Sequence, residues 1–298
     1  MTRTVAGRAS LAQRLDALPF TRSHLRVLTG SGTGWALDAM DVGLISFIIA
    51  ALVQHWNITT FESGLIASVG FAGMAIGATL GGLLADKFGR RQVFALSLIV
   101  YGLATGASAL VGGLVMLLVL RFFVGLGLGA ELPVASTYVS EFAPARMRGR
   151  LIVILEAFWA VGWIAAAVIG YLVIPMSDDG WRWAFALGAI PAVYAVVVRW
   201  GLPESPRWLA SRGRVAEADR IVTRFERDAG IQTPPAIHRE RAVDSVAATT
   251  RTRLSALWAP SFRLRTLSIW LVWFCVNFAY YGAFIWIPSI LVSKGFDS

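Results

Sequence analysis

Five ionisable side chains interrupt stretches of this sequence that are otherwise apolar. They lie in three separate stretches: Asp38, Asp41, Arg121, Glu131 and Glu156. An ionised group at the centre of a bilayer costs roughly 2.5 to 3.5 kcal/mol even on the lenient insertion scale, so such groups face a protein interior or a water-filled cavity. Within membranes, ionisable residues mark routes for ions or substrates more often than they serve structure alone. The pattern therefore favours transport chemistry, and a buried ion-pair network that only holds helices together is the alternative.

The first two of these residues could carry a proton. Asp38 and Asp41 are three positions apart, which places both on one face of a helix. Burial favours the protonated carboxyl and a nearby arginine favours the ionised one, so the proton affinity would change as helices move. Arg121 is the candidate counter-charge, but its planar guanidinium could also hold an anionic substrate. The sequence leaves open whether Arg121 pairs with both aspartates, with substrate, or with each in turn.

The composition is that of an integral membrane protein. Of its 298 residues 56% are hydrophobic and 15% are charged, and the mean hydropathy of +0.64 is far above soluble-domain values. The formal charge of +9 does not indicate nucleic-acid binding, because basic residues also accumulate beside membrane spans. The lone Cys275 excludes an intramolecular disulfide, and the three histidines are too scattered for a catalytic or metal site. We expect no cofactor, no metal and no enzymatic activity.

Seven apolar runs are long enough to cross a bilayer as helices. They cover about residues 30–54, 63–85, 93–111, 114–139, 151–174, 183–201 and 266–292. Residues 1–29 hold five arginines and no long apolar core, which predicts a cytosolic tail and not a signal peptide. The polar segment 202–265 has apolar residues at helical spacing over 215–225, which predicts amphipathic helices. The expected order is the tail, a six-helix half over 30–201, a linker over 202–265 and a seventh helix within 266–298.

The basic residues are distributed unevenly among the segments that connect these runs. Of 27 Lys and Arg residues, 24 lie in the tail, in the linker and its approach, and in the connections at 86–91 and 146–150. This positive-inside bias places the N-terminus in the cytosol. The excess of arginine over lysine suggests a GC-rich bacterial source, and hence an inner (plasma) membrane. A seven-helix receptor, the alternative from another class, would have its N-terminus outside, and its retinal-binding type would need a lysine within the seventh helix, whereas Lys294 lies past its end.

A short charged stretch between the second and third runs carries a specific spacing. Residues Gly82–Arg91 read G-x-x-x-D-x-x-G-R-R, which resembles the loop signature of the major facilitator superfamily between its second and third helices. Arg121 with Gly125, Gly127 and Gly129 resembles the R-x-x-x-G-x-G-x-G pattern in that family's fourth helix. Gly125 and Gly129 also form a small-x-x-x-small face, whose ordinary interpretation is close helix packing.

Two further motifs follow in the order that the family shows. The segment Glu141–Arg150 resembles the E-x-x-P-x-x-x-R-G signature after the fourth helix, and Pro203–Trp208 is similar to the P-E-S-P-R of sugar-porter relatives. The tail segment 14–20 and the Asp38-x-x-Asp41 pair resemble bacterial metabolite:proton symporters, including aromatic-acid transporters and relatives of synaptic vesicle protein two.

The resemblance implies an all-α membrane fold of twelve helices in two six-helix halves, with substrate bound at the midplane between them. This sequence would supply the first half, the linker and one helix of the second, so we expect a truncated or incomplete carrier. The function implied is secondary active transport of a small organic metabolite, with an organic or aromatic acid favoured, by proton symport and alternating access. A sugar:proton symporter and a non-transporting fragment are alternatives. Sugar is disfavoured because Glu156 stands where sugar porters usually have glutamine, and the seventh helix contains Asn277 but no glutamine.

The buried charges and the resemblance together assign two groups of residues. The substrate and proton pathway would use side chains inside the spans: Asp38, Asp41, Arg121, Glu131, Glu156 and Asn277. A cytosolic gate, closing the inner side in the outward-open state through ion pairs, would use the motifs at the helix ends: Gly82, Asp86, Gly89, Arg90, Arg91, Glu141, Arg148, Glu204 and Arg207. A solvated basic loop that serves only membrane topology is the alternative. The partners implied are a small-molecule substrate, protons and the lipid bilayer.

Overall fold

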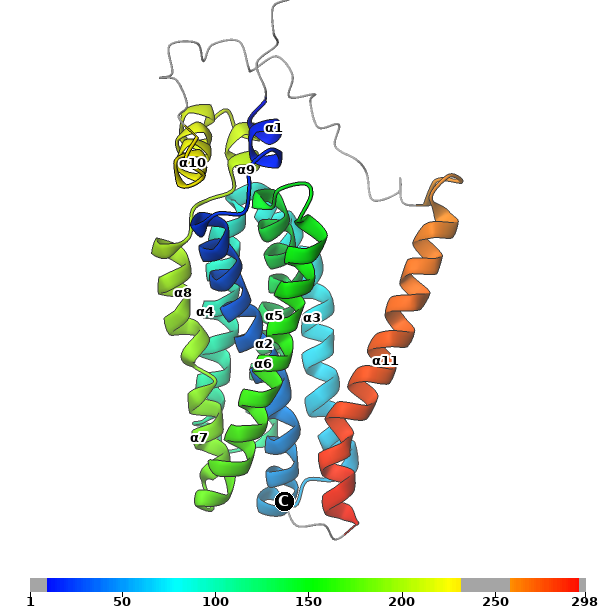
Figure 1. Ribbon diagram of the computed structural model, residues 1–298. Helices are drawn as coiled ribbons and strands as arrows, with labels where there is room; N and C mark the ends of the chain where they lie inside the picture. The colour runs from blue at the N-terminus through cyan, green and yellow to red at the C-terminus, as the bar shows by residue number, and fades with distance from the viewer. Residues whose placement is uncertain (1–9, 232–257, 295–298) are drawn as a thin grey trace, which may run out of the picture. The chain divides into compact units, whose positions relative to one another are not determined.

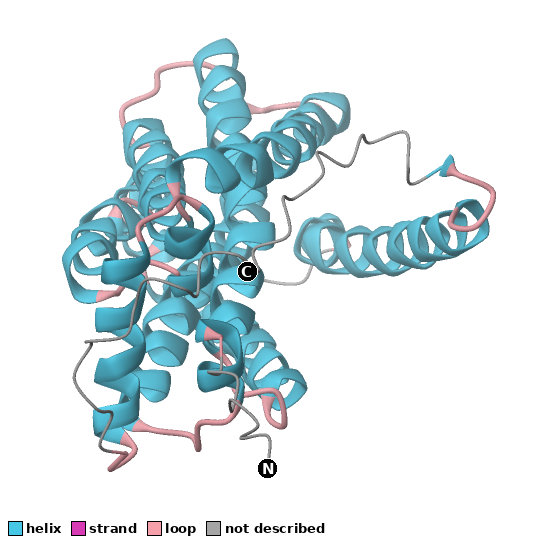
Figure 2. Cartoon of the chain, turned by 90° about the horizontal axis from the view of Figure 1, so that it is seen from above, coloured by secondary structure: helices cyan, strands magenta, loops and turns pink. Residues whose placement is uncertain are grey.

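The computed structural model of the chain describes residues 10–231 and 258–294. These residues form helices joined by loops, with no strand among them (Figure 2). The chain divides into two compact units, residues 1–235 and 236–298. Of the second unit the structure describes mainly one long helix, α11 (Arg263–Ser293).

The first unit is a bundle of long helices with three short helices at one end. In chain order its elements are α1 (Leu11–Asp16), α2 (Arg22–Trp56), α3 (Thr60–Phe88), α4 (Arg90–Ser108), α5 (Leu114–Phe142), α6 (Arg148–Leu172), a 3₁₀ turn (Ile174–Met176), α7 (Gly180–Leu187), α8 (Ile190–Gly201), α9 (Pro206–Ser211) and α10 (Val215–Asp228). The helices α1, α9 and α10 contact one another and lie at the same end of the bundle (Figure 1). We call this the capped end.

Six helical stretches in the described part of the chain are long and apolar enough to cross a membrane. They are Arg22–Trp56, Thr60–Phe88, Leu114–Phe142, Arg148–Met176, Gly180–Gly201 and Arg263–Ala283. The third predicted run corresponds to α4, which is 19 residues long, begins with two arginines and packs against α5 and α8. The prediction of an all-α, multi-pass membrane fold is confirmed.

Two helices differ in detail from the apolar runs, and local chemistry explains both. The helix α2 begins eight residues before the run at residue 30, because the backbone N–H of Thr21 donates to Nδ1 of His24 at 3.1 Å and closes the first turn. The run at 183–201 is divided into α7 and α8, with Gly188 and Ala189 between them. Pro191 in the first turn of α8 has no N–H to continue the α7 hydrogen-bond ladder.

Glycines allow α3 and α5 to approach with their backbones in contact. A Cβ atom added at Gly125 would lie 1.9 Å from the carbonyl oxygen of Gly70, and one at Gly77 would lie 2.1 Å from that of Leu126. Gly129 is equally close to the backbone of α3. The helix-packing interpretation of Gly125 and Gly129 is therefore confirmed, and small residues act here as they do between membrane helices in general.

Candidate substrate and proton pathway

The central helix of the bundle carries the two aspartates. In the most apolar stretch of α2, 72% of the residues are buried inside the protein, whereas in that of α6 only 17% are buried. Asp38 and Asp41 are 3% and 2% exposed, and both lie on the part of α2 that faces its neighbours α4 and α5. The prediction that these acids point into the protein and not into lipid agrees with their burial.

Asp41 is paired with Arg121 across α2 and α5. The guanidinium Nη1 lies 3.7 Å from Oδ2 of Asp41, and the hydroxyl of Thr105 on α4 donates to Oδ1 of Asp41 at 2.6 Å. The guanidinium also lies over the ring of Phe185, 5.1 Å from its centroid. Among the described residues, Asp41 Oδ2 and Arg121 Nε have no hydrogen-bond partner. The pair is thus held in place but keeps hydrogen-bonding capacity for a proton or a ligand.

Asp38 faces a different set of neighbours from Asp41. It interacts with the side chains of Tyr101 on α4 and Glu131 on α5. Glu131 and Tyr101 are fully buried, and both carboxyl oxygens of Glu131 lack a hydrogen-bond partner within the described part of the chain. We call Asp38 and Glu131 the acid pair. The acid pair therefore places two buried carboxyl groups next to each other between α2 and α5.

The remaining two pathway candidates lie elsewhere. Glu156 is exposed on α6 and faces the indole of Trp35, whose ring packs on Trp159 with 5.6 Å between centroids. Asn277 belongs to the second unit, on α11, where its side-chain amide donates to the carbonyl of Trp273 at 2.8 Å. The structure therefore brings together four of the six predicted pathway residues, in two adjacent pairs. Sequence reasoning did not identify Thr105 and Tyr101, since a hydroxyl in an apolar run carries no pattern of its own.

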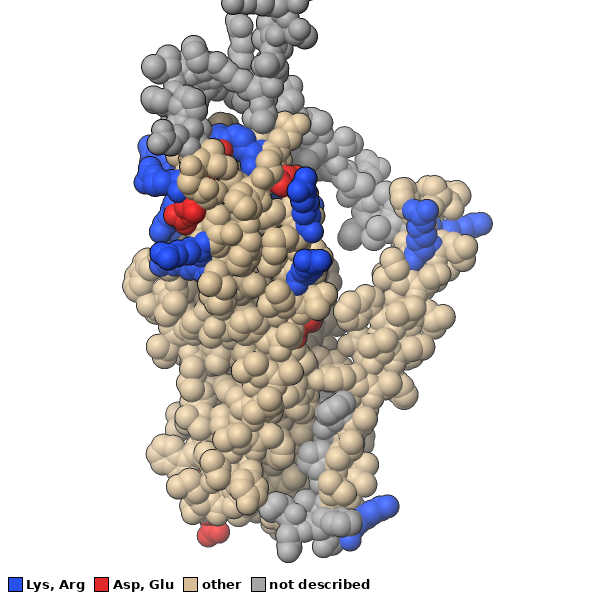
Figure 3. Space-filling model, in the orientation of Figure 1, with Lys and Arg blue, Asp and Glu red and all other residues tan. Residues whose placement is uncertain are grey.

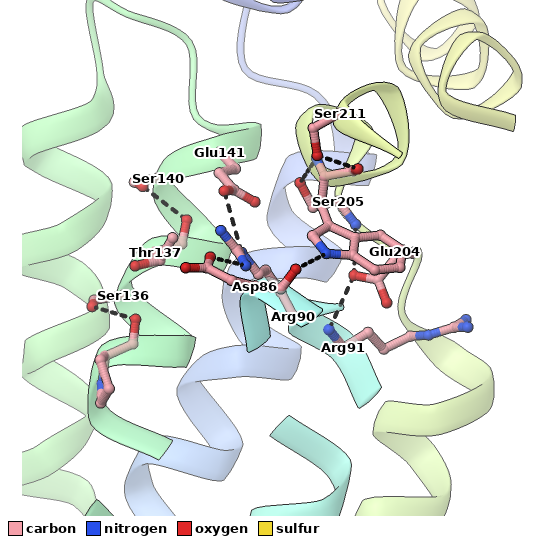
Figure 4. A network of polar contacts seen from close by, with 12 residues as sticks. Asp86, Arg90, Arg91, Ser136, Thr137, Ser140, Glu141, Glu204, Ser205 and Ser211 are labelled. Atoms are coloured by element: carbon pink, nitrogen blue, oxygen red, sulfur yellow. Dashed lines mark hydrogen bonds and ion pairs between the residues drawn. The ribbon is translucent and has the colours of Figure 1, made fainter. Parts of the chain in front are cut away.

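The motif between α3 and α4 is folded more tightly than a loop. Its only non-helical residue is Gly89, because α3 ends at Phe88 and α4 begins at Arg90. Arg90 bridges two acids: Nη1 lies 2.6 Å from Oδ1 of Asp86, and Nε lies 3.4 Å from Oε1 of Glu141 at the end of α5 (Figure 4). The predicted partnership between this turn and Glu141 is present.

Arg91 and Glu204 join the turn to the segment before α9. The backbone N–H of Arg91 donates to Oε1 of Glu204 at 3.1 Å (Figure 4). The guanidinium of Arg91 donates to the carbonyl of Leu202 at 3.2 Å. Trp208 adds a bond from its indole to the carbonyl of Asp86 at 2.9 Å. We call Asp86, Arg90, Arg91, Glu141 and Glu204 the turn cluster. A Cβ at Gly82 would have no atom within 4 Å, so the first glycine of the motif makes no close contact in the first unit.

Replacing Gly89 by alanine is expected to lower the free energy of unfolding by about 2 kcal/mol. Its φ of +106° strains any residue with a Cβ, and the added methyl would lie 2.6 Å from Oε2 of Glu204. The measurement is thermal unfolding of the purified protein. The matched control is Gly213→Ala, because Gly213 has φ +74° and open space around it. A Gly89→Ala protein no less stable than the Gly213→Ala protein would contradict the role given to Glu204.

The other two gate arginines meet a residue that sequence reasoning did not assign. Arg148 and Arg207 both donate to Oδ1 of Asp16, at 2.7 and 3.1 Å. Arg14, two residues earlier, is clamped by Asp219 at 2.7 Å and by both carboxylate oxygens of Glu226 at 2.7 Å. The tail segment 14–20 contains both Arg14 and Asp16 and resembles metabolite:proton symporters, but this resemblance alone does not indicate ion pairs. The predicted gate residues thus form two clusters, and the tail holds the second one together.

Replacing Arg14 by glutamine is expected to release the tail from α10. It removes the cation that Asp219 and Glu226 share, which are 10% and 7% exposed, and should cost about 2 kcal/mol locally. Hydrogen exchange of the α1 and α10 amides would report the release. Arg224→Gln, an exposed change on the same α10, is the control. Unchanged exchange in Arg14→Gln relative to this control would refute the clamp.

The basic side chains of the bundle gather at the capped end. On the face drawn in Figure 3, blue residues surround this end of the bundle, and the middle of the bundle is almost entirely tan. This is the distribution that the positive-inside rule requires of a membrane domain with one arginine-rich side. The cytosolic orientation of that side stays a prediction from the charges.

A family model described as "Sugar (and other) transporter" matches residues 24–296. The chain belongs to this transporter family. The match agrees with the resemblance of the motifs at Gly82–Arg91 and Arg121–Gly129 to the major facilitator superfamily. Family membership therefore groups the chain with membrane transporters and not with enzymes.

Two bacterial relatives are similar over almost all of this chain. The niacin transporter NiaP of Acinetobacter baylyi is 47% identical over 287 residues, which are 96% of this chain and 64% of that protein. A putative niacin/nicotinamide transporter of Bacillus subtilis is 43% identical, over 92% of this chain and 60% of that protein. The chain therefore spans less than two thirds of the length of these relatives.

A solved structure supports the fold. The partially occluded, inward-open xylose transporter XylE from E. coli matches with a TM-score of 0.62 over 68% of this chain and 53% of that chain, at 24% identity. At this identity the match concerns the fold alone. The described helices correspond to about half of a major facilitator structure.

Proposed function

We propose that the chain provides the substrate- and proton-binding half of a carrier that moves niacin, or a closely similar pyridine carboxylate, with protons. The two niacin-transporter relatives at 47% and 43% identity support the substrate. Niacin is a small aromatic acid, the substrate class that the sequence favours. The observation that carries the proposal is the guanidinium of Arg121, which is fixed inside the bundle at 4% exposure and keeps hydrogen-bonding capacity for a carboxylate.

Two protonation sites, Asp41 and the acid pair, would couple substrate binding at Arg121 to the proton gradient. When Asp41 takes up a proton, its attraction for Arg121 weakens and the guanidinium becomes available to the substrate carboxylate. When the proton leaves towards the cytosol, Asp41 competes for Arg121 and the substrate is released. The acid pair of Asp38 and Glu131 lies beside this site and can accept or supply the proton. In this scheme the substrate carboxylate and the ionised Asp41 bind the guanidinium of Arg121 in turn.

The turn cluster and the Asp16 cluster would act at the capped end as the cytosolic gate. Asp86, Arg90 and Glu141 connect α3, α4 and α5, and Asp16 connects the tail with Arg148 and Arg207. Opening the inner side requires these helix ends to separate from the other half, so ion pairs that can break and re-form suit this position. Asp86 has a side chain 72% exposed, which leaves it free to exchange partners.

The test is uptake of radiolabelled niacin by proteoliposomes with an imposed proton gradient. Two proteins are compared: this chain, and an extended carrier in which the chain is continued by the aligned remainder of the Acinetobacter relative. We expect saturable uptake by the extended carrier that collapses with a protonophore and is inhibited by unlabelled niacin but not by xylose. Inhibition by xylose and not by niacin would favour the sugar:proton symporter instead. An uptake rate that the protonophore does not change would refute proton coupling.

A further inference from the structure

The hydroxyl group of Thr105 on α4 lies between Asp41 and Arg121. It donates to Oδ1 of Asp41 at 2.6 Å and accepts from Nη2 of Arg121 at 3.4 Å, and Thr105 is 1% exposed. A hydroxyl has one proton, so while that proton is donated to Asp41, only the lone pairs of the oxygen are left for Arg121. Thr105 therefore connects the proposed proton site to the cation that the substrate would bind.

This hydrogen bond distinguishes the two protonation states of Asp41. A hydroxyl donates a stronger hydrogen bond to an ionised carboxylate than to a neutral carboxyl group, because the carboxylate oxygen carries more negative charge. Thr105 therefore favours the ionised Asp41, which in the proposed scheme is the form that competes with the substrate for Arg121. Removing the hydroxyl should favour the protonated form instead.

The ionisable groups around Asp41 do not duplicate this contact. Arg121 on α5 forms an ion pair with it, and Asp38 on α2 and Tyr101 on α4 interact with it through charge. Oδ2 of Asp41 has no hydrogen-bond partner in the described part of the chain. Among those residues, the hydroxyl of Thr105 is thus the one hydrogen-bond donor to this carboxyl group.

The break between α7 and α8 fixes the direction of the Thr105 hydroxyl. The two helices follow one another along the bundle, and α4 packs against both (Figure 1). A Cβ atom at Gly188, within this break, would lie 2.3 Å from Cγ2 of Thr105, so the glycine leaves room for the threonine methyl group. The methyl and the hydroxyl share one Cβ atom and turn together about χ1. A methyl group held against Gly188 therefore keeps the hydroxyl directed at Asp41.

We propose that Thr105 is a positioning residue of the proton site: its hydroxyl sets the pH at which Asp41 takes up a proton, and Gly188 holds that hydroxyl in place. The inference rests on the proposed proton coupling through Asp41, but not on niacin as the substrate. Two substitutions separate the hydrogen bond from packing. Serine at position 105 would keep the hydroxyl without the methyl group, whereas valine would keep a similar shape without the hydroxyl.

The experiment is an infrared titration of the purified chain in lipid bilayers without substrate. The absorption of protonated carboxyl groups is followed against pH, and the part that disappears in Asp41→Asn belongs to Asp41. We expect the midpoint of this part to rise by about one pH unit in Thr105→Val and in Thr105→Ala, because a hydrogen bond to a charged group is lost. Thr105→Ser should keep a midpoint near the wild-type value.

The matched control is Ser108→Ala on the same helix. Ser108 is fully buried, but its hydroxyl donates to the carbonyl of Ala104 at 2.8 Å and not to a carboxylate, so its loss should leave the midpoint unchanged. Gly188→Ala tests the orientation, because the added methyl group would displace Thr105 and should raise the midpoint. Combining Gly188→Ala with Thr105→Ser removes the methyl group that is struck and should restore the midpoint. Thermal unfolding checks that each variant is folded.

The proposal would be overturned by an unchanged midpoint in the folded variants without the hydroxyl, or by an equal shift in Thr105→Ser or Ser108→Ala. Absence of any carboxyl absorption that depends on Asp41 would overturn it as well. A double variant that keeps the shift of Gly188→Ala would refute the part played by the glycine. Niacin uptake by the extended carrier is measured separately, so a carrier with another substrate would leave the titration result standing, and a titration without the shift would leave the uptake result standing.

Discussion

The Gly77→Ala protein is expected to lose about 3 kcal/mol of stability and to be recovered mostly as misfolded material. The added methyl would lie 2.1 Å from the carbonyl oxygen of Leu126, which is backbone and cannot rotate away. The helices α3 and α5 would have to separate along the whole crossing, and the contacts of Gly125 and Gly129 with α3 would be lost as well. Thermal unfolding and the monodisperse fraction in size-exclusion chromatography measure the effect.

Gly82→Ala on the same helix is the control, because its stability is expected to stay the same or to rise. No atom lies within 4 Å of a Cβ at Gly82. Alanine has a higher helix propensity than glycine by about 0.8 to 1 kcal/mol, so this variant should be neutral or slightly more stable. If both variants had the same stability, the close crossing of α3 and α5 would be wrong.

Asp41→Asn is expected to reduce proton-driven niacin uptake by the extended carrier roughly a hundredfold. The amide cannot take up the proton, and it leaves the buried Arg121 without its only ion-pair partner among the described residues. Initial uptake rates, measured with and without an imposed pH gradient, give the effect. Asp179→Asn is the control, because it makes the same change where the aspartate is 71% exposed, and it should leave uptake intact.

The double variant Asp41→Asn with Arg121→Gln separates folding from coupling. It removes both buried charges, so it should recover the stability that the single variant loses. Uptake should nevertheless stay low, because the proton site and the cation are both gone. Wild-type coupling in either variant would show that the acid pair or Glu156 carries the proton instead.

The helical fold was largely predictable because a bilayer restricts the options. Apolar runs of span length must become helices, and the positions of six of the seven runs agree with helices long enough to cross. The break before Pro191 and the early start of α2 at Arg22 were not predicted, since they depend on single hydrogen bonds and not on hydropathy.

The burial of the two aspartates could be predicted from the sequence, but their pairings could not. The spacing of Asp38 and Asp41 correctly places both inside, yet it cannot reveal that one meets Arg121 and the other meets Glu131. That outcome is decided by how α4 and α5 cross α2, which brings Thr105 to one acid and Tyr101 to the other. In the same way, the sequence does not distinguish Asp16 from other tail residues, because its partners Arg148 and Arg207 meet it only when the start of α6 and α9 fold beside it.

The clamp on the tail has a consequence for the order in which the protein is made. Arg14 leaves the ribosome early, but its partners Asp219 and Glu226 follow 205 and 212 residues later. At common rates of synthesis this interval is roughly 10 to 40 s. The tail must therefore wait until α2 to α8 have been synthesised, and its attachment can occur only after the whole bundle has emerged. The capped end is therefore the last part of the first unit to be completed, and a chain stalled before residue 219 would lack both acids that pair with Arg14.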